Sequence, residues 1–286
     1  MVLNLKDYPR KQYNIDQFAQ PPCYELEGET FYFVMDGGYD YELRITGRTS
    51  CQWNIAGEAP HEESYRCLKA DDDTYLFHYD VKGANPRTGH TYVIDTEQRL
   101  VTMIICKVGL NPRFPYLVST EFDFGALRIE GEELPFKRHS FTTDLLETQV
   151  QWNWRPGFFT QHYYYCTNFY RITYPKTSGA KVEFTDHSHL LPSSDEWARY
   201  IKIKGNIYLF VLTEELQERI LQGRSRFRSN SMAFLQNYDR MNLVGRSFGN
   251  AMVEDKAVPI NMLFSAFGQP VELPPEFLNA PNPYVV

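Results

Sequence analysis

The stretch FYFVMDGGYDYELRI, residues 31–45, decides the fold class, because apolar side chains recur in it at every second position. The alternation runs up to an Asp-Gly-Gly turn at residues 36–38 and resumes after it. A period of two is typical of a half-buried β-strand, and a glycine-rich turn between two such runs predicts a β-hairpin. The stretch therefore predicts a β-sheet protein.

Further strands of the same kind follow at short spacing along the chain. We predict them at residues 51–55, 65–68, 75–80, 90–94, 100–106 and 150–154. Regular short strands separated by turn residues are typical of a meander, a sandwich or a barrel. The 20 Tyr, 20 Phe and 4 Trp residues also favour a sheet, and they predict walls that can hold a flat organic ligand.

The second half of the chain repeats the first, since the string Tyr-Leu-Phe at residues 75–77 recurs at residues 208–210. The second half is longer after this string, and the extra residues predict a short amphipathic helix at 214–222 with Thr213 as its N-cap. The simplest architecture is all-β, with two tandem antiparallel barrels. Its predicted parts are an N-terminal extension (1–27), a first barrel (28–110), a connector (111–147), a second barrel (148–252) and a C-terminal tail (253–286).

The composition is that of a globular chain with a net charge of −7. Nucleic-acid phosphates require a basic surface, and the longest apolar stretch is far short of a membrane span. We therefore expect neither nucleic acid nor a membrane as a partner, and we leave a homodimer open. The five cysteines are odd in number and contain no CxxC pair, which predicts core thiols and a cytoplasmic location.

The first predicted barrel contains a candidate acid–base pair on one strand. His78 and Asp80 lie two residues apart, so they point to the same side, and Arg66 is expected to hold an anion beside them. Tyr41 completes this candidate catalytic set. A competing interpretation turns the aromatic residues of the same strand toward the core, which leaves His78 and Asp80 in solvent.

The second predicted barrel offers a comparable set. His162 and Tyr164 share a strand face, and with Trp152 and Arg171 they would form an aromatic pocket for a phenol, an enolate or a carboxylate. An ordinary sheet with one solvent-exposed face explains the same pattern, and this alternative stays open. The candidate substrate-binding residues of the two barrels are Phe33, Trp53, Trp152, His162, Tyr164 and Arg171.

Metal and cofactor motifs are scarce in this sequence. His187 and His189 share a strand face, as zinc or iron ligands can, but no third ligand follows at a fixed spacing. The chain contains neither GxGxxG nor GxxxxGK[ST], the patterns that dinucleotide enzymes and P-loop NTPases require. We therefore expect neither a metal nor another cofactor.

Three segments carry a family resemblance. The Gly-Gly-Tyr hairpin, the string QWNWRPGF at residues 151–158 and the string GRSFG at residues 245–249 together resemble the MoaF family. That resemblance implies two calycin-like (lipocalin-type) domains over almost the whole chain. It implies a fold, and nothing in the sequence points to molybdenum chemistry.

The first half is also similar to the phenolic acid decarboxylases, over residues 31–103 and through the same hairpin. That family uses two tyrosines on the strand before the hairpin, where this chain has Phe33 and Met35. By analogy of fold we expect a cofactor-free enzyme that binds an apolar, conjugated molecule and catalyses a cyclase, isomerase or lyase step, such as a Diels–Alder type of cyclisation. The alternatives are a small-molecule carrier and a phenolic-acid-type decarboxylase.

Overall fold

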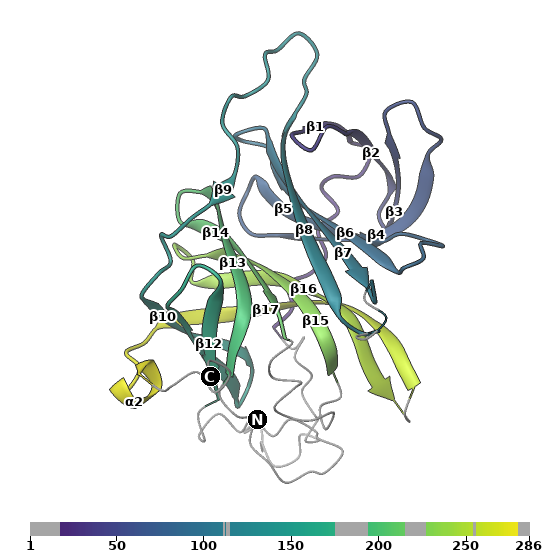
Figure 1. Cartoon of the computed structure of the whole chain (residues 1–286). Helices are drawn as coiled ribbons and strands as arrows, with labels where there is room; N and C mark the ends of the chain where they lie inside the picture. Colours follow the sequence, from purple (N-terminus) through teal and green to yellow (C-terminus); the bar gives the residue numbers. More distant parts are fainter. Residues whose placement is uncertain are drawn as a thin grey trace, which may run out of the picture.

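A computed structural model describes residues 18–110, 112, 115–174, 194–214, 227–253 and 256–279 of the chain as an all-β protein (Figure 1). The first barrel consists of β1 (Thr30–Met35), β2 (Asp40–Gly47), β3 (Ser50–Ile55), β4 (His61–Lys69), β5 (Thr74–Asp80), β6 (Thr88–Asp95), β7 (Leu100–Val108) and β8 (Val118–Leu127). Each strand pairs with the next, and β8 pairs with β1 to close the barrel.

The second barrel follows along the chain and lies below the first in Figure 1. It consists of β10 (Thr148–Arg155), β11 (Phe158–Tyr164), β12 (Phe169–Thr173), β13 (Ser194–Lys204), β14 (Ile207–Thr213), β15 (Phe227–Asn237), β16 (Asn242–Val253) and β17 (Lys256–Pro270). Pairing of β12 with β13 closes it. The short β9 (Ser140–Phe141) adds to β13, and α2 (Pro275–Leu278) follows β17. The predicted all-β fold, with two tandem antiparallel barrels, is confirmed.

The predicted domain boundaries are too narrow for both barrels. β8 lies within the predicted connector, residues 111–147, and β17 lies within the predicted tail, residues 253–286. Without β8 the strands β1 and β7 would each leave a row of unpaired backbone groups, and β17 fills the same role between β10 and β16. Of the helix predicted at 214–222, Glu214 is not helical and the rest lies outside the described residues.

The hairpin that decided the fold class forms as predicted. β1 and β2 pair antiparallel, with Phe33 opposite Tyr41. Gly38 adopts a φ of +92°, a left-handed conformation that favours glycine. A Cβ on Gly37 would lie 2.5 Å from one oxygen of the Asp123 carboxylate and would displace that side chain, whose other oxygen accepts a hydrogen bond from the Gly37 amide at 3.0 Å.

The outer faces of the two barrels pack against each other through a shared apolar layer. The first barrel contributes side chains from β4 to β8, and the second contributes side chains from β13 to β16. The layer comprises Leu68, Ala70, Leu76, Val93, Ile104, Cys106, Val118, Ile201, Ile203, Ile207, Leu209, Val211, Ala233, Leu235, Val244 and Phe248. Strands of both barrels are therefore buried on two faces, one toward the barrel interior and one toward the other barrel.

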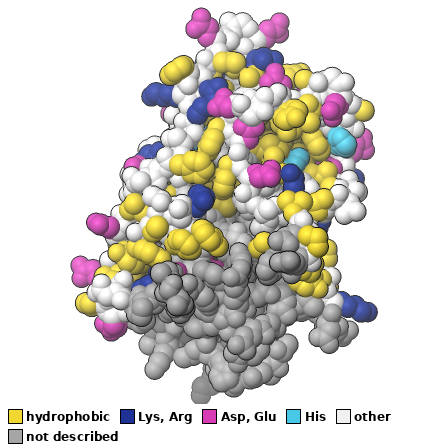
Figure 2. Space-filling model, in the orientation of Figure 1, with side chains coloured by type: hydrophobic (Ala, Val, Ile, Leu, Met, Phe, Trp, Pro, Cys, Tyr) yellow, Lys and Arg dark blue, Asp and Glu magenta, His cyan; other side chains and the backbone are white. Residues whose placement is uncertain are grey.

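The exposed surface of the described residues mixes charge signs. On the face shown in Figure 2, Lys and Arg side chains are interspersed with Asp and Glu side chains, between patches of hydrophobic ones. Neither sign dominates that face. Within the described ranges, no helix has the length and apolar character needed to cross a membrane.

A close contact between the barrels yields a prediction. A Cβ added to Gly89 on β6 would lie 2.5 Å from the Phe248 ring of β16, so Gly89→Ala should destabilise the protein by about 1–3 kcal/mol through overpacking. A Phe248→Leu background lacks the aromatic ring that the new Cβ would meet. In that background, Gly89→Ala should lower the free energy of unfolding much less. Urea unfolding of the native protein, the two single variants and the double variant measures the coupling between Gly89 and Phe248. Equal costs in both backgrounds would show that the barrels do not press on each other at this point.

Candidate functional site

The interior of the first barrel is aromatic and holds three of the predicted residues. Phe33, Tyr41 and Trp53 all point into it and are at least nine-tenths buried. Trp53 stacks on His61 with ring centroids 4.6 Å apart, and its indole N–H has no hydrogen-bond partner within the described ranges. The Tyr79 hydroxyl lies 3.1 Å from His90 Nδ1 in the same interior. Sequence reasoning did not single out Tyr79 or His90 as site residues.

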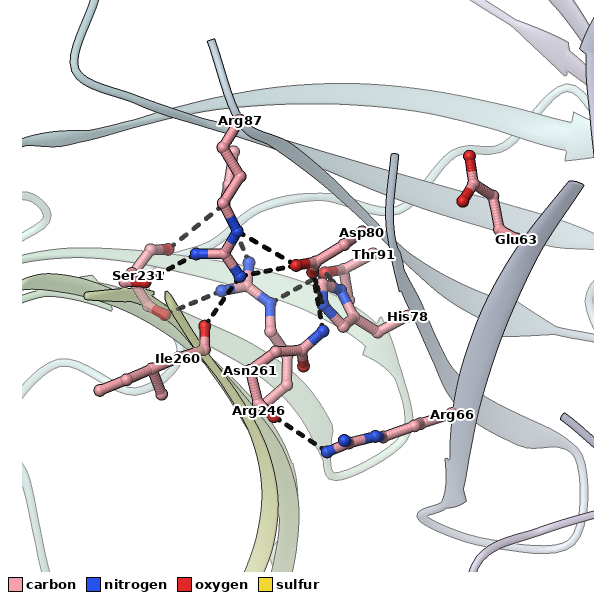
Figure 3. Close-up of polar contacts among 12 residues, drawn as sticks. Glu63, Arg66, His78, Asp80, Arg87, Thr91, Ser231, Arg246, Ile260 and Asn261 are labelled. Carbon is pink, nitrogen blue, oxygen red and sulfur yellow. Dashed lines mark hydrogen bonds and ion pairs between the residues drawn. The ribbon is translucent and has the colours of Figure 1, made fainter. Parts of the chain in front are cut away.

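The predicted acid–base pair lies on the outside of the first barrel, in the contact between the barrels (Figure 3). His78 is 1% exposed, and its Nδ1 lies 2.8 Å from Thr91 Oγ1. Asp80 accepts hydrogen bonds from Arg87 at 2.6 Å and from Asn261 of the second barrel at 2.7 Å. His78 therefore faces neither the barrel interior nor solvent, the two orientations considered from sequence.

Two further arginines complete this inter-barrel cluster. Arg66 donates to the backbone carbonyl of Asn261 at 2.9 Å. Arg246 is fully buried and donates to Thr91 Oγ1, to the Ser231 carbonyl and to Cys106 Sγ. The pKa of His78 is lowered to about 4, mainly by burial; nearby Arg246 acts in the same direction, whereas Asp80 opposes the shift. These contacts join the two barrels, and His78 is neutral at pH 7.

The second barrel brings three of its four predicted residues together. Trp152, His162 and Tyr164 all point into its interior and are at most 1% exposed. Arg171 lies on the outside of β12 instead, where it forms an ion pair with Asp195 at 2.7 Å. The alternation of β12 explains this difference, because its neighbours Tyr170 and Ile172 occupy the inward positions.

The interior hydrogen bonds fix where the protons lie. Trp152 Nε1 and Gln236 Nε2 both donate to the Tyr164 hydroxyl oxygen, at 3.3 and 2.8 Å. The Tyr164 proton therefore points to His162 Nδ1 at 3.3 Å, and His162 carries its own proton on Nε2, 3.0 Å from Thr160 Oγ1. Desolvation lowers the pKa of His162 to about 3, so this side chain is a neutral hydrogen-bonding group at pH 7.

One end of the same interior carries polar side chains, which we call the polar end. It comprises Tyr170, Glu196, Glu214, Asn230 and Ser247. Tyr170 pairs across strands with Glu196, and the Glu214 amide donates to the Asn230 carbonyl at 3.0 Å. Ser247 pairs with Met232, whose side chain packs against the interior cluster. Paired residues of neighbouring strands share a face, so these side chains converge.

Several atoms of the polar end are buried with hydrogen-bonding capacity unused. Among the residues that the structure describes, the Tyr170 hydroxyl, both amide atoms of Asn230 and the Ser247 hydroxyl have no hydrogen-bond partner. A Cβ at Gly249 would lie 2.1 Å from Asn230 Oδ1, so only glycine leaves room for this amide beside β16. Each unsatisfied buried polar group costs about 1–3 kcal/mol, a cost that a bound polar ligand would remove.

The polar end also holds a carboxyl group suited to proton transfer. Glu214 continues the inward series of Tyr208, Phe210 and Leu212 by one more step of two. Desolvation raises the pKa of Glu214 to about 7. The pKa of Tyr170 is raised mainly by burial and further by the charges of nearby groups, Glu214 among them. Glu214 and Tyr170 are therefore close enough to interact electrostatically.

Sequence reasoning missed Glu214 because it assigned this residue to the first turn of a helix. The alternation of residues 208, 210 and 212 is the signal that predicts an inward Glu214. Of the residues examined as metal ligands, His187 and His189 lie outside the described residues. Within the described ranges, no three His, Cys, Asp or Glu side chains gather as metal ligands do.

The buried histidine of the second barrel yields a pH prediction. The unfolded chain protonates His162 below its ordinary pKa of 6.5, whereas the folded chain does so only near 3, so stability falls as the pH drops through this window. His162→Gln should reduce the slope of unfolding free energy against pH by about 1.4 kcal/mol per pH unit between pH 6 and 4. Urea unfolding at several pH values measures the slope. A variant slope equal to the native one would contradict the burial of a neutral imidazole.

Comparison with known families bears on the first barrel. A family model described as the MoaF N-terminal domain matches residues 13–109, about a third of the chain. No curated protein matches the chain. The matched range contains β1 to β7 and with them Tyr41, Trp53 and His78. The resemblance to the MoaF family is therefore confirmed for residues 13–109, which match the N-terminal domain of that family.

Proposed function

We propose that this chain is a cofactor-free enzyme that binds a flat, conjugated small molecule in the second barrel and moves a proton on it during an isomerase, lyase or cyclase step. The observation that carries the proposal is the Glu214 carboxyl at a barrel interior end where Tyr170 and Asn230 have unused hydrogen-bonding capacity. A carrier needs only shape and hydrogen bonds, whereas an acid–base enzyme needs an ionisable group with a pKa near the working pH.

The walls of the site favour a flat substrate. Trp154 and Phe264 lie in the same interior, with ring centroids 5.7 Å apart and an edge-to-face geometry. The ring centroids of His162 and Tyr170 lie 5.0 Å apart. The hydrogen-bonded chain of Tyr164 and His162 therefore leads to the polar end. Aromatic faces bind conjugated molecules by stacking and by edge contacts. The polar end then supplies the hydrogen bonds that orient such a molecule.

The chemistry follows from the groups at the polar end. Glu214 with a pKa of about 7 is present in both protonation states at neutral pH, so it can accept a proton from carbon and return it. For a substrate with a carbonyl group, the Tyr170 hydroxyl or the Asn230 amide would donate a hydrogen bond to the oxygen as it becomes an enolate. A buried site strengthens these interactions because it excludes water. The same donors would polarise a carbonyl during a cyclisation.

The first-barrel residues have a different role in this proposal. His78, Asp80 and Arg66 are engaged in contacts between the barrels, so we assign them to assembly of the two barrels rather than to proton transfer. The expected ligand remains a small apolar or aromatic molecule. A cytoplasmic location is part of the proposal, and it is supported by the described cysteines, none of which forms a disulfide.

A flat ketone tests the proposal without knowledge of the natural substrate. β-Tetralone carries acidic C–H groups next to its carbonyl, and its deuterium uptake in D₂O can be followed by proton NMR. The native protein should accelerate the exchange, with a rate that rises through an apparent pKa near 7, because ionised Glu214 is the base. Glu214→Gln should remove about 99% of this acceleration.

Two outcomes would contradict the proposal. Glu272 is an exposed carboxyl outside the barrel strands, and Glu272→Gln therefore serves as the matched control that keeps native exchange. Equal loss in both variants would show that the exchange does not depend on Glu214. Binding of β-tetralone without any acceleration by the native protein would favour the carrier.

A further inference from the structure

Two cysteines that are far apart in the sequence lie in contact at the first barrel. Cys23 precedes β1, and Cys67 lies on β4 with its side chain in the barrel interior. The Cys23 amide donates to the Cys67 carbonyl at 2.9 Å, so the two backbones run side by side at this point. The two thiols are close enough to shift each other's pKa, and Cys67 Sγ also lies 3.6 Å from the Leu68 carbonyl oxygen. The sequence analysis predicted both as core thiols, because the five cysteines are odd in number and contain no CxxC pair.

The surroundings make the two thiols unequal. Interaction with Cys67 lowers the pKa of Cys23 to about 6, although its burial acts in the opposite direction. The other charged groups that face Cys23 are Glu25 and Lys69, which form an ion pair with each other. The pKa of Cys67 is raised by the same interaction and by burial. At neutral pH a Cys23 thiolate therefore lies beside a Cys67 thiol, the pairing that thiol oxidation uses.

We propose that Cys23 and Cys67 are a redox site that a peroxide converts reversibly into an intramolecular disulfide. In the first step the Cys23 thiolate attacks a peroxide oxygen. A sulfur–oxygen bond forms, the oxygen–oxygen bond breaks, and hydroxide leaves, so Cys23 becomes a sulfenic acid. In the second step the Cys67 sulfur displaces that oxygen as water and the sulfur–sulfur bond forms. The two thiols are oxidised together, and hydrogen peroxide is reduced to water.

The position of the pair gives the disulfide a structural consequence. Cys23 and Leu26 belong to the apolar core of the first barrel, and the Gly28 amide donates to the Ile45 carbonyl at 3.0 Å. The segment before β1 therefore packs across strands of the barrel. A disulfide from Cys23 to β4 would tie this segment to the barrel covalently. This inference does not depend on the function proposed for the second barrel.

Cys51 provides the matched control within the same barrel. It is 1% exposed on β3, and burial raises its pKa to about 12, so it stays a protonated thiol. Cys51→Ser should leave peroxide oxidation of the Cys23–Cys67 pair unchanged. Cys67→Ser should stop the reaction after its first step, and the resulting Cys23 sulfenic acid should react with dimedone.

The test is performed on the full native chain with hydrogen peroxide. After brief treatment, the protein should lose two of its five cysteine thiols, and its mass should fall by about 2 Da. Peptide mapping should find Cys23 joined to Cys67, and dithiothreitol should restore both thiols. Retention of all five thiols, a disulfide that joins other cysteines, or no dimedone adduct on Cys23 in Cys67→Ser would overturn the proposal.

Discussion

The packing of one barrel wall on the other is the constraint on which the rest of this structure depends. Leu76 and Val93 of the first barrel and Leu209 and Leu235 of the second are fully buried in the layer between them. Burial of apolar area at about 25 cal/mol per Å² is the dominant favourable term in such a contact. Each barrel thus covers an apolar outer face that it could not leave in water.

This constraint also explains the polar residues of the contact. Arg246, which is fully buried on β16, needs acceptors because an unpaired guanidinium in an apolar layer is costly. Thr91 and Cys106 of the first barrel supply two of them, and the Ser231 carbonyl supplies a third. The layer therefore also fixes how the two barrels align. If one barrel slid along the other, Arg246 would lose its hydrogen bonds to Thr91 and Cys106 of the first barrel.

The same strands position the proposed active site. β14, β15 and β16 turn Leu209, Leu235 and Val244 outward to the first barrel, and their inward positions lead to Glu214, Asn230 and Ser247. Strands held on both faces move little, which suits a site whose acid–base group and hydrogen-bond donors must keep their relative positions. The first barrel thus contributes to the second-barrel site by holding its wall, without reaching it.

Some of this organisation could be predicted from sequence and some could not. The period of two in residues 31–45 predicts the hairpin, and the alternation around His162 and Tyr164 predicts their shared face. β8 was missed because its half-buried residues alternate weakly and follow a proline-rich stretch. The place of His78 could not be predicted, because a strand buried on both faces loses the contrast between inside and outside. In β5, six of seven residues are buried.

The proposed function requires the second barrel to keep a carboxyl group ready for proton transfer at neutral pH. Carbon-13 NMR of protein labelled at the glutamate side-chain carboxyls tests it most directly, with Glu214→Gln used to assign the resonance. The Glu214 carboxyl carbon should titrate with a pKa of about 7. A Glu214 resonance that titrates near 4.3, as a solvated glutamate does, would contradict it.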